Sequence, residues 1–164
     1  MHVYCLFCQT QRARRIAELM ETNGWGQAFT PRVVCRHRVQ GKIEDKPYDL
    51  LPGYVFLFTE EPVADFSELR KMDGVGYQVG RREDQFELCG SDREFAMGLL
   101  AVNGLVSPMT LVHEGEKVKL LNPLFEYSHG VITKIEYKKQ RAKVDFFFDQ
   151  KRWSTWVAMD ELYL

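Results

Sequence analysis

The sequence predicts an α+β fold, in which a small α/β domain is followed by a five-stranded SH3-like β-barrel. Apolar residues recur with helical spacing only before residue 104. After residue 113 the chain contains five short β-type runs separated by turn residues or charges. The residues between carry Gly104 and Pro108, which is typical of a linker. We therefore expect domains at 1–104 and 114–164, joined by a linker at 105–113.

The first two predicted elements are a strand and a helix. The run VYCLFC at 3–8 is rich in β-forming residues and predicts a strand. Thr10 is a good helix cap, and Gly24 is a good helix end. Between them one apolar stripe repeats at helical spacing, which predicts an amphipathic helix. Its members are Ala13, Ile16, Ala17 and Met20.

A polar hairpin and an apolar strand follow. RVVCRHRV leads into Gln40-Gly41, which predicts a hairpin with Arg36, His37 and Arg38 near its tip. The stretch LLPGYVFLF at 50–58 is apolar on both faces of a strand. Because side chains alternate along a strand, Tyr54, Phe56 and Phe58 share one face, and Val55 and Leu57 share the other. The alternation leaves open which of the two faces meets the core.

Two further helices complete the first predicted domain. Residues 62–72 predict a short helix, and Ser91-Asp92-Arg93-Glu94 is a capping-box sequence that opens a helix ending at Asn103-Gly104. Between them lies GVGYQVG at 74–80. Its glycine spacing is not that of a dinucleotide-binding loop, and a helix precedes it instead of following it. These glycines therefore predict turns and a strand.

The predicted barrel carries positive charge and aromatic residues together. Its five runs are EKVKLL, GVITKIEY, KVDFFFD, STWVAM and LYL. Residues 131–153 contain seven Lys or Arg against three Asp or Glu, a local charge of +4 in a chain of net charge −1. Basic groups beside aromatic rings favour RNA, although core aromatics with solubilising lysines fit the pattern equally well. The candidate RNA-binding residues are Lys134, Lys138, Lys139, Arg141, Lys143, Lys151 and Arg152.

The remaining motifs argue against an enzyme, a metal site or a membrane protein. No apolar window reaches the roughly 18 residues of a membrane span, and no signal peptide is evident, so we expect a cytoplasmic protein. Cys5-x-x-Cys8 has no second pair, and its odd spacing in a strand places the two sulfurs on opposite faces. We therefore expect no metal, no cofactor and no catalytic residues. A thiol enzyme using Cys5 or Cys8 is the alternative.

Taken together, these motifs resemble the NusG/Spt5 family of transcription elongation factors over essentially the whole chain. The VYCLF run, the helix after it, the polar hairpin and PGYVF are similar to a NusG N-terminal domain. DGVGYQVG resembles a later segment of that domain. EGEKVKLLNPLFEYSHGVITKI resembles a KOW motif, with Gly115, Val118, Pro123 and Gly130 in the expected order. The resemblance implies a NusG-type antiparallel α/β sandwich followed by a KOW β-barrel.

The resemblance also implies a function and a set of contacts. NusG-like proteins bind the clamp helices of RNA polymerase and suppress pausing or termination. By position, Phe7, Tyr54 and Phe56 match the apolar patch that makes this contact. The hairpin of the family lies near upstream or non-template DNA, and the candidate DNA-contacting residues are Arg14, Arg15, Arg36, His37 and Arg38. The KOW domain would contact nascent RNA, such as a hairpin, or a partner protein.

Departures from the family pattern indicate a specialised NusG paralogue. Among such paralogues, the chain resembles LoaP most. Val3-Tyr4 stand where a tryptophan is common, the KOW loop is one residue longer, and FDQKRW replaces a glycine turn. These changes do not favour the contacts of general NusG with ribosomal protein S10 or with Rho. KVDFFFD and VITKIEY favour strands, which argues against the helical refolding of RfaH-type proteins. We expect a monomer; the alternative is a stand-alone KOW-type RNA-binding or ribosome-associated module.

Overall fold

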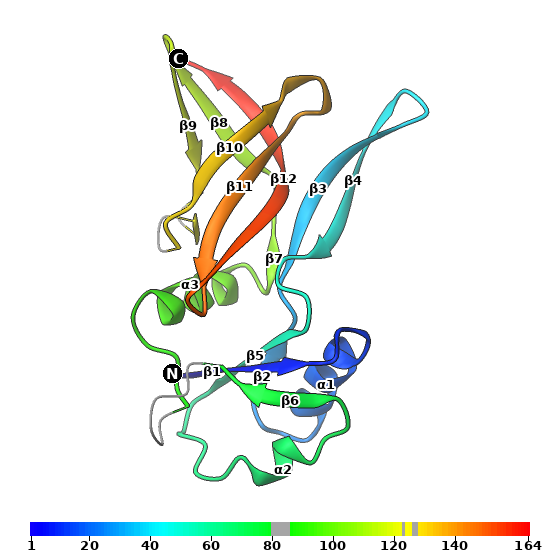
Figure 1. Ribbon diagram of the computed structural model, residues 1–164, viewed down its shortest axis with the longest axis vertical. Coiled ribbons are helices and arrows are strands. Elements are labelled where there is room, and N and C mark those ends of the chain that lie inside the picture. The colour runs from blue at the N-terminus through cyan, green and yellow to red at the C-terminus, as the bar shows by residue number, and fades with distance from the viewer. Residues whose placement is uncertain (80–85, 123, 126–127) are drawn as a thin grey trace. The chain divides into compact units, whose positions relative to one another are not determined.

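The computed structural model describes residues 1–79, 86–122, 124–125 and 128–164 (Figure 1). It is a mixed α+β structure that divides into two compact units. The first unit joins Met1–Pro31 to Leu51–Gly104, and the second joins Arg32–Leu50 to Leu105–Leu164. Gly80 of GVGYQVG and Pro123 of the KOW-like motif lie outside the described residues. Within those residues, the helices are too short to span a bilayer.

The first unit is built on a four-stranded antiparallel sheet with the order β2-β5-β1-β6. Three helices accompany the sheet (Figure 1). The strands are β1 (His2–Cys8), β2 (Gln27–Phe29), β5 (Tyr54–Thr59) and β6 (Val75–Gln78), and the helices are α1 (Thr10–Thr22), α2 (Ser67–Arg70) and α3 (Gly90–Ala101).

One face of this sheet forms the core with α1 and α2. The stripe predicted for α1 is confirmed, since Ala13, Ile16, Ala17 and Met20 are all buried. Val55 and Leu57 of β5 pack in the same core, together with Leu69 of α2. Val55 and Leu57 face the helices, and the aromatic residues of β5 face the other way, where they are buried as well.

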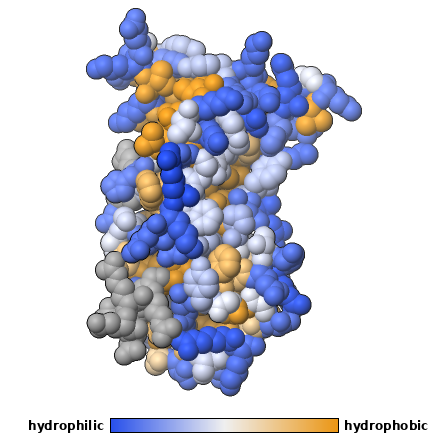
Figure 2. Space-filling view, viewed as in Figure 1, coloured by the Kyte–Doolittle hydropathy of each residue, from blue (hydrophilic) through white to orange (hydrophobic). Residues whose placement is uncertain are grey.

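The second unit contains a hairpin and a five-stranded sheet. The hairpin strands are β3 (Arg32–Val39) and β4 (Lys42–Asp49), and β7 (Leu105–Val106) pairs with β3 in parallel. Gln40 and Gly41 both have positive φ at the tip, as a two-residue hairpin turn requires. Hydrophobic side chains reach the surface around this tip (Figure 2), where Val39 and Ile43 are exposed.

The five-stranded sheet curls on itself with the order β10-β11-β12-β8-β9 (Figure 1). Alternate residues of β11 face its interior, where Ala142 packs with Leu111 and Met159. The bounds are β8 (Met109–Glu114), β9 (Lys117–Leu121), β10 (Val131–Glu136), the short 3₁₀ helix η1 (Tyr137–Lys139), β11 (Arg141–Phe148) and β12 (Lys151–Tyr163).

We call this curled five-stranded sheet the barrel; its strands differ from the predicted set. The predicted runs STWVAM and LYL belong to one long strand, β12. The fifth strand is β8, which lies mostly in the segment predicted as a linker and pairs with β12 and β9. The hairpin, expected within the first domain, belongs to the second compact unit. As bounds of separately folding domains, 1–104, 105–113 and 114–164 stay a prediction.

Three helix starts also differ from the sequence-based expectation. Thr10, predicted as a cap, is the first residue of α1; Gln9 holds the cap position, with no side-chain hydrogen bond. The capping box is not formed, because α3 begins at Gly90 after Cys89, with no side-chain cap. The helix predicted over 62–72 is reduced to α2. Asp65 accepts hydrogen bonds from the backbone N–H and the hydroxyl of Ser67, both at 2.9 Å. Such a local side-chain bond holds the chain in a turn and delays the helix start.

Candidate functional site

The first candidate site is the sheet face opposite the α1 and α2 core. Strand pairing brings aromatic residues from all four strands to this face, because Phe7 lies opposite both Tyr54 and Tyr77, and Phe29 lies opposite Phe56. The ring centroids of Phe7 and Tyr54 are 5.2 Å apart, and those of Phe7 and Tyr77 are 5.1 Å apart. We call this surface the aromatic face; it consists of Phe7, Phe29, Tyr54, Phe56, Phe58 and Tyr77.

Burial is uneven across the aromatic face. Tyr54 is 1% exposed and Phe56 is 0% exposed, so the expectation that both lie open to a partner is not met in this structure. Phe7 is half-buried, and Tyr77 is 47% exposed. Of the three residues predicted to bind polymerase, only Phe7 therefore reaches the surface. Tyr77, which is not among the predicted residues, extends the accessible end of the face.

Close backbone contacts fix this accessible end. Gly53 has a φ of +87°, and a Cβ added there would lie 2.7 Å from the carbonyl oxygen of Cys8. The Gly53 carbonyl accepts a 2.7 Å hydrogen bond from the backbone N–H of Cys8. Gly76 approaches the Phe7 carbonyl in the same way, with an added Cβ at 2.9 Å. The PGYVF and GVGY motifs therefore place Tyr54 and Tyr77 on either side of Phe7.

The two cysteines of Cys5-x-x-Cys8 lie on opposite faces of β1. Cys5 pairs with Phe56 on the side of the aromatic face, whereas Cys8 packs in the core with α1. Burial raises the pKa of the Cys8 thiol to about 12, so it stays protonated at neutral pH and is a poor nucleophile. Within the described ranges, no group of His, Cys, Asp or Glu side chains is arranged to hold a metal ion.

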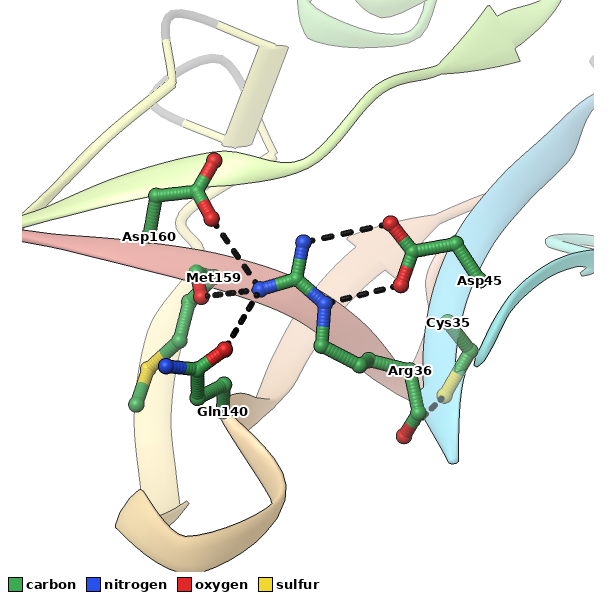
Figure 3. Close-up of polar contacts among 6 residues, drawn as sticks. All are labelled: Cys35, Arg36, Asp45, Gln140, Met159 and Asp160. Carbon is green, nitrogen blue, oxygen red and sulfur yellow. Dashed lines mark hydrogen bonds and ion pairs between the residues drawn. The ribbon is translucent and has the colours of Figure 1, made fainter. Parts of the chain in front are cut away.

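Arg36 is the centre of a polar network inside the second unit (Figure 3). Its guanidinium donates to both carboxylate oxygens of Asp45 on β4, from Nε at 2.7 Å and from Nη2 at 3.1 Å. Nη1 donates to the backbone carbonyl of Met159 at 2.9 Å, to Asp160 Oδ1 at 3.0 Å and to Gln140 Oε1 at 3.3 Å. Because Met159 and Asp160 belong to β12, the network fastens the hairpin to the barrel.

This network gives Arg36 a different role from the predicted one. The residue is only 8% exposed, and its donors already face two carboxylates and a carbonyl, so its guanidinium is not available to a phosphate. The paired Asp45 raises the pKa of Arg36 and is itself held at a lowered pKa by the hydrogen bonds from Arg36. The signal that the sequence could have offered is the pattern of acidic residues on β4, opposite the basic residues of β3.

The other predicted DNA-contacting residues remain nearer the surface. Arg38 is exposed near the hairpin tip, and His37 is half-buried with its ring centroid 5.2 Å from that of Tyr48. Arg14 and Arg15 are exposed on α1, where Arg15 pairs with Glu18 at 3.4 Å. The five residues are thus divided between the two compact units.

Most of the predicted RNA-binding residues are paired with carboxylates on the outer face of the barrel. Glu136 accepts a 3.0 Å hydrogen bond from Arg141 Nε and forms ion pairs with Lys139 at 3.6 Å and Lys134 at 3.7 Å. These three cations lower the pKa of Glu136, with the hydrogen bond from Arg141 as the largest cause. One carboxylate shared by three cations leaves this end of the barrel basic.

The remaining members of the set lie along the same strands. Lys151 pairs with Asp149 at 3.7 Å, and Arg152 pairs with Asp145. Lys138 is exposed in η1. Lys143 lies directly opposite Trp156 in the pairing of β11 with β12, and no ion pair forms at Lys143 within the described part of the chain. The structure thus brings the set onto neighbouring strands and leaves Lys143 beside an aromatic ring.

Comparison with solved structures shows a NusG-like fold. A structure of NusG from Thermotoga maritima, described as showing domain interaction in that protein, matches this chain with a TM-score of 0.55 and 20% sequence identity. The alignment covers 96% of this chain and 93% of that chain. No family model matches the sequence, and no curated protein matches it. The NusG-like fold is therefore confirmed, whereas the LoaP-like paralogue stays a prediction.

Proposed function

We propose that this chain is a transcription elongation and antitermination factor that binds the clamp helices of RNA polymerase through the aromatic face. The observation that carries the proposal is that Phe7 and Tyr77 reach the surface at one end of the aromatic face of a NusG-like sheet, beside the buried Tyr54. Aromatic side chains dominate the energetics of interface centres, because they bury large areas at low conformational cost. The accessible members, Phe7 and Tyr77, would make the first contact.

The barrel would contribute a second, weaker contact with nucleic acid. In this proposal nascent RNA lies against the basic residues of the barrel, which are Lys134, Lys138, Lys139, Arg141, Lys143, Lys151 and Arg152. DNA lies near four other basic residues, which are Arg14, Arg15, His37 and Arg38. Tethering to polymerase raises the effective concentration of RNA at the barrel, so a modest RNA affinity is sufficient. Binding would favour the polymerase state that resists pausing, and it would involve no covalent chemistry. The setting would be the cytoplasm of a bacterium, with the chain acting as a monomeric, specialised NusG paralogue.

A transcription assay tests this proposal. Single-round transcription with bacterial RNA polymerase would use a template that carries a pause site and an intrinsic terminator. We expect the added chain to shorten the pause and increase read-through, because clamp binding stabilises the elongating state. Tyr77→Ala should lose the effect. Phe147→Ala should keep it, since that side chain has the same 47% exposure but lies on the barrel.

The second candidate function is a stand-alone RNA-binding or ribosome-associated module. The basic outer face of β10 and β11 is the observation that favours it. In that case RNA binding would be measurable, but pausing and read-through would be the same with and without the chain. An effect that depends on Tyr77 excludes this second candidate.

A further inference from the structure

A groove lies inside the second unit, between the hairpin and two strands of the barrel. Its volume is about 420 Å³, within the range of about 300–1,000 Å³ that is usual for small-ligand sites. The hairpin supplies Cys35, His37 and Tyr48, and β11 and β12 supply Lys143, Ser154, Thr155 and Trp156. His37 is a predicted DNA contact and Lys143 a predicted RNA contact, yet both residues line this groove.

Each wall of the groove contains aromatic rings. On the hairpin side the rings of His37 and Tyr48 lie 5.2 Å apart with their planes tilted by 58°, and Tyr48 is 46% exposed. Trp156 is half-buried on the barrel side. Flat aromatic rings are the surfaces on which unpaired bases stack, and every base offers a π-face. A groove of this volume with rings on both walls suits a single base and its sugar.

Cations surround the barrel wall. Lys143 lies opposite Trp156 across the β11–β12 pair. The Arg141 guanidinium lies 4.3 Å from the centre of the Trp156 ring, and Lys134 Nζ lies 5.9 Å from it. Arg141 and Lys134 share Glu136, whereas Lys143 forms no ion pair with any described residue and acts on Asp145 only at longer range. A phosphate next to a stacked base would pair with the Lys143 ammonium group.

One wall residue of the groove also has unused hydrogen-bonding capacity. Nε2 of His37 is buried and makes no hydrogen bond to any residue that the structure describes. Buried polar groups in folded proteins are nearly always hydrogen-bonded, so an exception calls for an explanation. A small shift of the ring on binding would expose this atom to the polar edge of a base.

We propose that this groove binds one unpaired nucleotide of a nucleic-acid strand, with the base against Trp156 and the His37–Tyr48 pair and a phosphate at Lys143. The Arg36 network holds the hairpin wall against the barrel wall and so preorganises the groove. The inference deepens the proposed function, because it assigns the nucleic-acid contact to one site. Its test uses no polymerase, so failure here is distinguishable from failure of the polymerase contact.

The test is binding of the purified full chain to labelled oligonucleotides of about 12 nucleotides, measured by fluorescence anisotropy. Single-stranded RNA, single-stranded DNA and a fully paired duplex are compared. Trp156→Ala should weaken single-strand binding by about 5- to 100-fold, and Tyr48→Ala should weaken it in the same range. Trp156→Phe should restore most of the affinity, because it retains a stacking ring. Lys143→Ala should lower the slope of log K against log salt by about one.

Matched controls separate the groove from general charge and folding effects. Phe147→Ala removes an aromatic side chain of 47% exposure on β11, and Lys119→Ala removes an exposed lysine on β9. Both should bind as the unaltered chain does. Tyr48→Ala changes an exposed hairpin residue, so it tests the groove even if Trp156→Ala does not fold.

The outcomes divide clearly. Single-strand binding that is lost in Trp156→Ala and Tyr48→Ala and kept in both controls supports the proposal, and the ratio of RNA to DNA affinity identifies the natural strand. Equal binding by Tyr48→Ala, Trp156→Ala and the unaltered chain overturns it. So does a preference for the duplex, or the absence of binding to every oligonucleotide. Competition by an apolar peptide in place of a nucleotide would show that the groove is a protein-binding site.

Discussion

Replacing Arg36 by alanine should lower the free energy of unfolding of the second unit by about 2–3 kcal/mol. The substitution removes every bond of the network and leaves Asp45 and Asp160 without their common cation. Breaking a fully buried pair costs about 3–5 kcal/mol, and the expected value is lower because both aspartate side chains are partly hydrated. Urea unfolding followed by tryptophan fluorescence measures the change, since Trp153 and Trp156 lie in this unit.

The matched control is Arg38→Ala on the same strand. Arg38 is exposed, so its removal should change the unfolding free energy by less than about 0.5 kcal/mol. Equal effects of the two substitutions would show that the Arg36 network contributes no more than an ordinary surface arginine.

The pH dependence of stability is a second readout of the same network. The hydrogen bonds from Arg36 hold the pKa of Asp45 below its usual 3.8 in the folded state. Because the unfolded state takes up this proton first as the pH falls, the contribution is complete above the usual pKa and is lost as the pH falls through the lowered value. The stability difference between the unaltered chain and Asp45→Asn should therefore be constant above about pH 5 and shrink below about pH 4. A difference that persists in acid would contradict the assignment.

Phe56→Ala should destabilise the first unit by about 3–5 kcal/mol. Phe56 is fully buried, and its ring centroid lies 6.3 Å from that of Phe29, so truncation leaves a cavity that the sheet cannot close. The resemblance to NusG implies instead that this residue is a surface anchor whose loss spares the fold. Thermal and urea unfolding decide between the two, with Tyr77→Ala as the surface control on the same face. A Phe56→Ala variant as stable as Tyr77→Ala would restore the surface assignment.

Much of the local structure could be predicted from the sequence, because it depends on neighbouring residues. The 3.6-residue period of α1 and the Gln40-Gly41 turn of the hairpin are local signals, and both are confirmed. The alternation in PGYVFLF correctly separates Tyr54 and Phe56 from Val55 and Leu57. Alternation shows which side chains share a face, but it cannot show how much of that face the rest of the chain covers.

The features that sequence reasoning missed depend on residues far apart in the chain. Arg36 is a basic residue near a polar turn, which predicts an exposed position. Its burial is caused by Asp160, 124 positions away. β8 follows Pro108 and was assigned to a linker, but it is a strand because β12 pairs with it from Met159 onward. The groove could not be predicted for the same reason. Its walls come from β3 and β4 and from β11 and β12, and the local sequence of one pair does not show that the other pair lies beside it.

Binding of the full chain to bacterial core RNA polymerase tests the central claim most directly. Tyr77→Ala removes an accessible tyrosine of the aromatic face, and Tyr137→Ala removes one of similar exposure, 50% against 47%, from the barrel. The account predicts that the unaltered chain and Tyr137→Ala bind alike, and that Tyr77→Ala binds at least about tenfold more weakly, as expected for loss of an aromatic anchor. If the folded chain does not bind the polymerase, or if Tyr77→Ala binds as well as Tyr137→Ala, the aromatic face is not the polymerase-binding surface.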